Sequence, residues 1–274
     1  MVSKRHTAAF RYIVAGAFFM VACFPVVTAT AQTQQQLDRC LNYGGLVSYD
    51  VQIKSCTAVI QSGQRSKLYL PLAFHGRGYA YYKTDNYEAA IADFSEAIRL
   101  NPLDASALNN RCWVRAILGR DLPEALKDCN ESLRLRANDA PTLDSRGFTC
   151  LKLGQLNHAI SDYDAALGLD SSQAESYYGR GVAKLKTGDL HNGNADIAAA
   201  KTIQVDIAEV FAKYGIRLDH GTVTIAPTTA AKGADCARAV AQGEKAKDQR
   251  MTAYSGAIDY WDYVVWKDTL KPKR

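Results

Sequence analysis

The sequence has little net charge, no long apolar run and none of the common catalytic motifs. Its 33 lysines and arginines face 28 aspartates and glutamates in 274 residues, and residues 1–31 hold three of the basic residues and no acid. The remaining 30 basic and 28 acidic residues leave a charge of +2, which gives no electrostatic reason to expect a nucleic acid partner. The apolar run at 12–27 is short for a membrane span, and no other stretch approaches the ~20 apolar residues that one needs, so we expect no membrane span after removal of a leader.

Signatures of enzymes and metal sites are also missing. The sequence contains no phosphate-binding P-loop, no H-E-x-x-H and no G-x-S-x-G. No Cys-x-x-Cys occurs among the seven cysteines, which argues against a thioredoxin-like redox centre and a zinc knuckle. We therefore expect no catalytic residues, no metal and no cofactor.

Residues 1–31 have the pattern of a cleaved export signal. Basic residues precede an apolar run at 12–27, and Ala29 and Ala31 occupy the small-residue positions before a cleavage site. The alternative is a lipoprotein, because Cys23 ends a short segment that resembles a lipidation site. We favour simple cleavage near Ala31 over lipidation at Cys23. Either route predicts a periplasmic or secreted protein in an oxidising compartment.

A period of 34 residues organises the middle of the chain. Four blocks align at 71–104, 105–139, 140–173 and 174–207, the second with one extra residue. Position 8 of the blocks is small in each case: Gly78, Cys112, Gly147 and Gly181. Small residues at fixed positions let two helices approach closely, and large ones fill the space around them. Each block therefore predicts two short helices joined by a tight turn.

Two of these blocks resemble a tetratricopeptide repeat (TPR). The residues that carry the likeness are Phe74, Gly78, Tyr81, Tyr87, Ala90, Phe94, Ala97 and Pro102 in the first block, and Gly147, Gly154, Ala159, Tyr163 and Ala166 in the third. Four tandem copies make the resemblance specific over roughly half of the chain. It implies an all-α fold, a right-handed superhelical solenoid of helix-turn-helix repeats with a concave groove that binds proteins or peptides. It implies no enzyme, and two short segments of the chain are also similar to exported bacterial members of the family.

Four cysteines fall at two matching positions of the repeat. Cys112 lies at position 8 and Cys129 at position 24, once the inserted residue is discounted. Counting back 34 residues places a divergent repeat at 33–66, in which Cys40 and Cys56 occupy the same two positions. We predict the disulfides Cys40–Cys56 and Cys112–Cys129, each joining the two helices of one repeat. The alternative is four buried small residues.

The other two cysteines of the mature chain have no such match. Cys150 lies at a core-facing position of the third block, where a buried thiol is the favoured interpretation. A bridge from Cys150 to Cys236 is the alternative, and it would tie the C-terminal segment to the repeats.

An arginine and an aspartate recur together in every block. Position 7 holds Arg77, Arg111, Arg146 and Arg180, and position 23 holds Asp93, Asp128, Asp162 and Asp196. A guanidinium beside a close-packed position needs acceptors, and a carboxylate matches its geometry. The pattern predicts a ladder of ion pairs within a repeat or to the next repeat. The alternative is a row of arginines that binds anions, which we disfavour because acids match bases in number.

One face of the first helix of each repeat supplies the candidate partner-binding residues. Positions 2, 5, 9 and 12 share this face, which the TPR resemblance places in the concave groove. The candidates are His75, Tyr79, Tyr82, Asn109, Trp113, Asp144, Phe148 and Tyr178. Aromatic side chains at position 9 offer large contact area to an apolar or aromatic segment of a protein or peptide partner. The alternative is that they pack against neighbouring repeats or against a tail of the same chain.

The family also has a clamp of lysine and asparagine residues that holds acidic C-terminal peptides. The corresponding positions here are His75, Tyr79, Asn110, Pro141 and Ser145. Only Asn110 fits, so we do not expect this clamp.

The sequence thus predicts five segments. They are a signal peptide at 1–31, a divergent repeat at 32–70, four repeats with a capping helix at 71–217, a linker or extended segment at 218–235, and a helical and aromatic tail at 236–274. The predicted function is a non-enzymatic protein-interaction scaffold of the bacterial cell envelope. Two alternatives are a structural module whose groove is filled by its own C-terminal tail, and a lipoprotein-anchored envelope adaptor.

Overall fold

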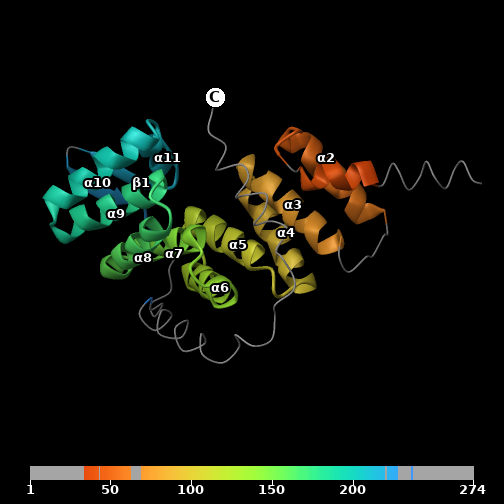
Figure 1. Cartoon of the computed structure of the whole chain (residues 1–274), viewed down its shortest axis with the longest axis horizontal. Coiled ribbons are helices and arrows are strands. Elements are labelled where there is room, and N and C mark those ends of the chain that lie inside the picture. The colour runs from red at the N-terminus through yellow and green to blue at the C-terminus, as the bar shows by residue number, and fades with distance from the viewer. Residues whose placement is uncertain (1–33, 43, 63–68, 220, 228–235, 237–274) are drawn as a thin grey trace, which may run out of the picture.

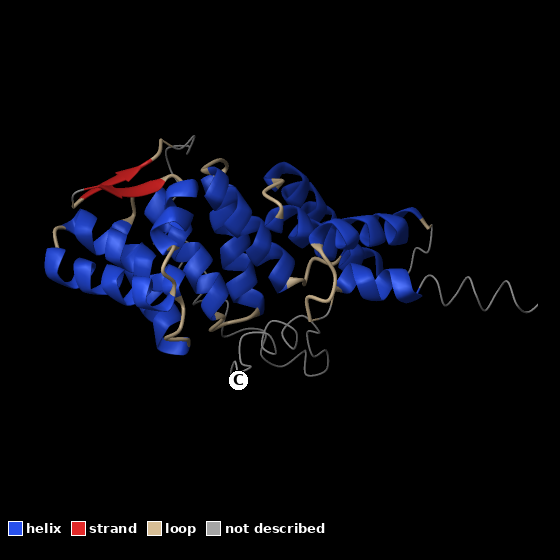
Figure 2. Cartoon of the chain, turned by 90° about the horizontal axis from the view of Figure 1, so that it is seen from above, coloured by secondary structure: helices blue, strands red, loops and turns tan. Residues whose placement is uncertain are grey.

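A computed structural model of the chain describes residues 34–42, 44–62, 69–219, 221–227 and 236. Residues 34–41 are helical. The elements that follow are α2 (Tyr49–Gln61), α3 (Tyr69–Lys83), α4 (Tyr87–Leu100), α5 (Ala105–Leu118), α6 (Leu122–Leu135), α7 (Ala140–Lys152), α8 (Leu156–Leu169), α9 (Ala174–Thr187), α10 (Leu190–Ile203), α11 (Ile207–Lys213), β1 (Ile216–Asp219) and β2 (Thr222–Ile225). Consecutive helices pack in pairs, and the pairs stack in chain order from α2 on one side to α11 on the other (Figures 1 and 2). The predicted all-α solenoid of helix-turn-helix repeats is confirmed.

Short polar side chains begin many of these helices. Asn86, Asp104, Asp139 and Asp189 each accept a hydrogen bond from a backbone N–H in the first turn of α4, α5, α7 and α10. The turn between the two helices of a repeat needs a left-handed residue, and Gly119 and Gly188 supply it after α5 and α9. These turns lie where the sequence predicts them.

The two helices of each repeat cross most closely at positions 8 and 24. Two different pairs of residues fill this contact in the chain. The first places glycine against a large side chain, and an added Cβ would come within 3.0 Å of the partner in the pairs Gly78–Phe94, Gly147–Tyr163 and Gly181–Ile197. The second places a cysteine at both positions, and the structure joins Cys40 to Cys56 and Cys112 to Cys129. A disulfide therefore replaces the packing of glycine against a bulky residue at the same site.

A third pair of cysteines connects the repeats to a distant segment. Cys150 is bonded to Cys236 across 86 positions of the sequence, whereas the sequence favours a buried thiol at Cys150. The backbone N–H of Cys236 also donates to Gln155 Oε1 at 2.7 Å. Both contacts hold Cys236 against the third repeat.

The structure contains the predicted arginine–aspartate pairs in all four repeats. In Arg77–Asp93, Arg111–Asp128, Arg146–Asp162 and Arg180–Asp196, Nε and Nη2 of the arginine donate to the two carboxylate oxygens at 2.6–2.9 Å. Both members come from the same repeat, so each pair fastens a first helix to its second helix. The geometry is bidentate, which is the strongest form of this interaction.

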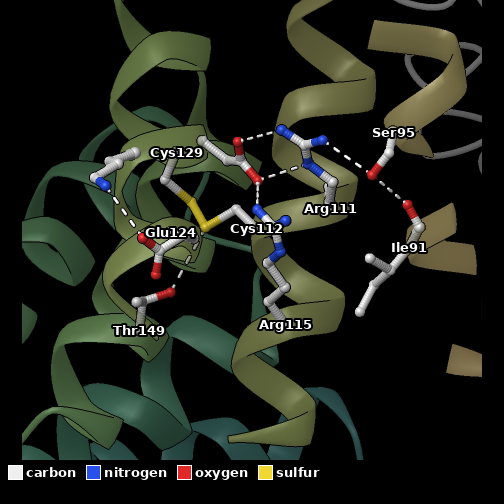
Figure 3. Close-up of polar contacts among 10 residues, drawn as sticks. Ile91, Ser95, Arg111, Cys112, Arg115, Glu124, Cys129 and Thr149 are labelled. Carbon is white, nitrogen blue, oxygen red and sulfur yellow. Dashed lines mark hydrogen bonds and ion pairs between the residues drawn. A yellow bond between two sulfur atoms is a disulfide. The ribbon is translucent and has the colours of Figure 1, made fainter. Parts of the chain in front are cut away.

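Each arginine also forms a hydrogen bond with the preceding repeat, which was not predicted from the sequence. Its Nη1 donates to a side chain at position 25 of the repeat before: Thr57, Ser95, Asn130 and Asp164, at 2.6–3.1 Å. Figure 3 shows this bond between Arg111 and Ser95. The fourth repeat has Ala198 at position 25, and the helix that follows it, α11, brings no arginine to that site. One guanidinium thus ties three helices together.

The solenoid ends in a truncated repeat. The sequence predicts a capping helix at 206–216, and α11 ends at Lys213. Within the described residues, α11 is followed by strands β1 and β2, which form an antiparallel hairpin in which Ile216 pairs with Ile225. Strand β2 lies in the stretch expected as a linker or extended segment. In the part of the chain that the structure describes, every helix is too short or too polar to cross a membrane.

Candidate partner-binding groove

The predicted groove residues separate into two groups by exposure. His75, Phe148 and Tyr178 expose 2%, 0% and 1% of their surface. The other five are partly buried: Tyr79, Tyr82, Asn109, Trp113 and Asp144. A partner can contact only the second group without displacing other parts of the chain. We call the part of the groove around Phe148 and Tyr178 the closed half, and the part around Tyr79 and Tyr82 the open half.

The closed half is occupied by the last helix of the solenoid. Phe211 of α11 exposes 1% of its surface, and its ring centroid lies 4.5 Å from Tyr178 and 5.7 Å from Phe148. Tyr214, which follows α11, places its ring edge-on to Trp113 at 5.6 Å. The sequence left open whether a tail of the same chain fills the groove. In the described residues the filling segment is α11 with Tyr214, and the tail at 237–274 lies outside the described residues.

Tyr214 also makes polar contacts with the groove. Lys152 Nζ donates to the backbone carbonyl of Tyr214 at 2.6 Å and lies 5.8 Å from the centroid of the Phe148 ring. Burial lowers the pKa of Lys152. The Tyr214 hydroxyl interacts with that of Tyr82 in the first repeat. Tyr214 therefore spans side chains from three successive repeats.

Tyr82 marks the border between the two halves. Its hydroxyl accepts a hydrogen bond from Nε1 of Trp113 at 3.0 Å. Burial raises the pKa of Tyr82, and the nearby Tyr214 adds to the increase. The neutral phenol is thus retained in a network that links the aromatic side chains of the first and second repeats.

The open half carries a row of four partly exposed tyrosines, which we call the tyrosine strip: Tyr49, Tyr79, Tyr82 and Tyr87. Successive ring centroids lie 6.4, 6.1 and 6.4 Å apart across α2, α3 and α4. The exposed Lys83 places Nζ 5.9 Å from the Tyr79 ring and 5.7 Å from the Tyr82 ring. The sequence reading missed Tyr49 and Tyr87, because one lies in the divergent repeat and the other at the start of a second helix.

His75 is a structural link between the first two repeats. Its Nδ1 lies 2.9 Å from Asp104 Oδ2, and its Nε2 lies 3.0 Å from Asn110 Nδ2. Burial acts to raise the pKa of Asp104, but His75 and the backbone N–H of Ala107 outweigh it and leave that pKa lowered. Asn110 was the one residue that matched the family's carboxylate clamp, and its amide is used here inside the protein.

Asp144 lies between the third and fourth repeats, in surroundings that disfavour the charged form of its carboxyl group. Its Oδ1 accepts a hydrogen bond from Ser176 Oγ at 2.6 Å. Burial raises the pKa of Asp144 to about 7, and the nearby Glu175 contributes. The carboxyl therefore titrates near neutral pH in the folded protein.

We expect the free energy of unfolding to fall between about pH 4 and pH 7 because of Asp144. The ordinary pKa is 3.8 and the folded value is about 7, so in this range the folded state holds a proton that the unfolded state has lost. The loss is absent below the unfolded pKa and complete above the folded one. One pKa unit corresponds to about 1.4 kcal/mol. Because the Asp144 side chain keeps some exposure to solvent, which weakens the effect, we expect the free energy of unfolding to fall by about 2 kcal/mol in total.

Urea unfolding of wild type and Asp144→Asn from pH 4 to pH 8 measures this effect. The asparagine variant should lose less stability across the range than wild type. Asp50→Asn, at an exposed position of α2, is the matched control and should follow wild type. Parallel curves for wild type and Asp144→Asn would contradict the assignment.

The described residues bring together no metal-binding cluster of histidine, cysteine, aspartate or glutamate side chains.

Comparison with known proteins agrees with the repeat pattern and the fold. A family model described as tetratricopeptide repeat matches residues 71–103, and one described as TPR repeat matches 147–188. The chain therefore contains tetratricopeptide repeats, as the pattern of four blocks predicts. TPR repeats are interaction modules and generally not enzymes. This supports the general prediction of a protein-interaction scaffold.

Two solved TPR structures resemble the fold of this chain. MamA from Desulfovibrio magneticus RS-1 is 16% identical with a TM-score of 0.53, covering 64% of this chain and 95% of that one. A thermophilic TPR protein from Thermus thermophilus is 17% identical with a TM-score of 0.52, covering 66% and 96%. At these identities the likeness concerns the fold alone.

A short stretch also resembles a curated plant protein. Hsp70-Hsp90 organizing protein 3 of Arabidopsis thaliana is 39% identical over 59 residues, which is 22% of this chain. The match spans 10% of the plant protein's length, so it concerns a small part of that protein.

Proposed function

We propose that this TPR protein is a non-enzymatic scaffold of the bacterial cell envelope that binds an apolar or aromatic segment of a partner protein in its concave groove. The observation that carries the proposal is the tyrosine strip in the open half. Tyrosine gives a large contact area and a polar group while losing little conformational entropy on binding. Four such rings in a row, partly exposed, form a surface suited to hot-spot contacts.

The chemistry of the strip favours an aromatic or apolar segment over an acidic C-terminal peptide. The likeness to a plant protein that organises Hsp70 and Hsp90 raises the second option. However, Tyr79 stands at a clamp position, and Asn110 already bonds His75. Lys83 is an exposed positive charge beside the rings, and it can select a partner with an acidic residue next to its aromatic one.

The location is part of the proposal and rests on residues 1–31, which lie outside the described residues. Cleavage near Ala31 would release the scaffold into the periplasm or the medium, whereas lipidation at Cys23 would make it an anchored adaptor. The mass of the mature N-terminal peptide separates the two. A mature protein that begins after Ala31 supports the first, and a lipid-modified Cys23 supports the second.

A second candidate function is a structural module with a self-filled groove. The packing of Phe211 and Tyr214 against Trp113, Phe148 and Tyr178 favours it for the closed half.

Quantitative cross-linking in the envelope fraction tests the proposed scaffold. Tyr49→Ala combined with Tyr79→Ala should reduce capture of the partner by ~tenfold or more, because two adjacent contact rings are lost. Tyr81→Ala is the matched control, because Tyr81 lies on α3 but contacts Arg77 outside the strip. Control and wild type should capture equally. Equal capture by the strip variant, with circular dichroism unchanged, would move binding away from the strip.

A further inference from the structure

Three side chains of α11 and of the residue that follows it are spaced like the anchor residues of a helix bound in a groove. Ile207, Phe211 and Tyr214 are related by four and three positions, so they share one face. Ile207 exposes 0% and Phe211 1% of their surface. Glu209 and Lys213 of the same helix are exposed. The segment is therefore a short amphipathic helix with its aromatic face inward.

At least one of these residues makes a different contact from the residue at the same position of the full repeats. Continuing the period from residue 208 puts Tyr214 at position 7, where the four full repeats have the arginine that pairs with its own second helix. In the part of the chain that the structure describes, β1 and β2 stand where a second helix would follow α11. Tyr214 instead contacts Trp113 and Phe148 of the second and third repeats. The last helix thus uses its face toward the concave groove.

We propose that α11 with Tyr214 is a built-in ligand of the groove, and that an amphipathic helix of a partner takes its place. The pattern recognised is an apolar residue followed by aromatic residues four and seven positions later, as in the segment itself. Recognition of a helix by such anchors in an apolar groove is a common mode of peptide binding. The inference rests on the proposed function in one respect, that the concave face is where partners bind.

The anchoring of the segment is compatible with exchange. A helix of seven residues has little stability of its own in water, so its position depends on the three inward side chains and on the Lys152–Tyr214 hydrogen bond. Val205 before it is 87% exposed, and Gly215 after it has φ +81°, a conformation that glycine adopts most readily. Exchange would therefore release residues 207–214 between these two points, while Ile216 beyond Gly215 stays buried.

A tethered ligand competes strongly with a free one. A segment linked to its site by a short connection has an effective concentration in the millimolar range. The wild-type groove should therefore bind a free helix of the same kind weakly, and loss of the internal anchors should restore affinity. A purely structural cap would be needed for folding but would not exchange with a peptide.

The test uses a fluorescent synthetic peptide of residues 205–217 and the full chain. The double variant Phe211→Ala, Tyr214→Ala should bind the peptide at least ~tenfold more tightly than wild type. A peptide with the same two alanines should bind neither protein. Equal binding of the parent peptide to both proteins, or no binding to the folded double variant, would overturn the proposal.

Two further measurements keep the test decisive. If the double variant does not fold, Tyr214→Ala alone retains Phe211 and should show a smaller gain in affinity for the peptide.

The chain has three tryptophans, so Trp261→Phe with Trp266→Phe leaves Trp113 as the reporter. Peptide binding should change the Trp113 emission, and binding without a change would overturn the assignment to this half. Peptide exchange without capture of an envelope partner would sustain the inference while removing the proposed scaffold.

Discussion

Replacing Arg146 by alanine should lower the free energy of unfolding by about 3–5 kcal/mol. Arg146 and Asp162 expose only 7% and 4% of their surface, and two hydrogen bonds of 2.9 and 2.6 Å join them. Removing the guanidinium leaves a buried carboxylate without its counter-charge. Burial already raises the pKa of Asp162, and Arg146 opposes that rise, so the pKa of Asp162 should rise further in the variant. The bond to Asn130 of the preceding repeat is lost as well.

Thermal and urea unfolding measure this effect, with a surface pair as control. Arg99 pairs with Glu96, but its side chain is 64% exposed, so Arg99→Ala should change stability far less than Arg146→Ala does. Arg146→Met combined with Asp162→Leu should recover much of the loss, because no charge is then left buried. An Arg146→Ala protein that melts at the wild-type temperature would contradict the structural role of the ladder.

Loss of the Cys112–Cys129 bridge should cost about 3 kcal/mol. Both cysteines expose 0% of their surface, and the bridge closes a loop between residues 17 apart in sequence. A crosslink of this length restricts the unfolded chain, and in the folded state it replaces the glycine and bulky pair of the other repeats. Without the bond, position 8 holds a residue larger than glycine and position 24 one smaller than phenylalanine or tyrosine, so the crossing packs less well.

The comparison is between wild type and Cys112→Ala with Cys129→Ala under oxidising conditions. Reductant should destabilise wild type by at least as much, because it also opens Cys40–Cys56 and Cys150–Cys236, and it should affect the variant less. Peptide mapping by mass spectrometry without reduction should show all three crosslinks. Free, alkylatable thiols at 112 and 129 in protein isolated from its own compartment would contradict the pairing.

The features that the sequence predicts are those that recur with the period. Position 8 against position 24, and position 7 against position 23, are contacts within one repeat, and four copies repeat the same spacing. For this reason the turns, the pairing of Arg111 with Asp128 and the two cysteine pairs within repeats could be predicted from the spacing alone. The contact at position 25 was predictable in the same way, since a hydrogen-bonding side chain stands there in each repeat that precedes an arginine.

The features that the sequence could not supply lie where the period ends. No repeated spacing relates Cys150 to Cys236, and nothing in residues 207–225 indicates that the second helix is replaced by a hairpin. The aromatic residues at position 9 illustrate the same limit. Tyr79 and Phe148 are equivalent in register, yet one belongs to the open strip and the other is buried, because α11 covers only the later repeats.

Site-specific photo-cross-linking shows whether the tyrosine strip contacts a partner. A photoreactive phenylalanine analogue at residue 79 faces the strip, and the same analogue at residue 81 faces the Arg77 side of α3. We expect irradiation of intact cells to give a discrete crosslinked partner from residue 79 and none from residue 81. Crosslinks from residue 81 alone, or from neither position with folded protein at native levels, would contradict it.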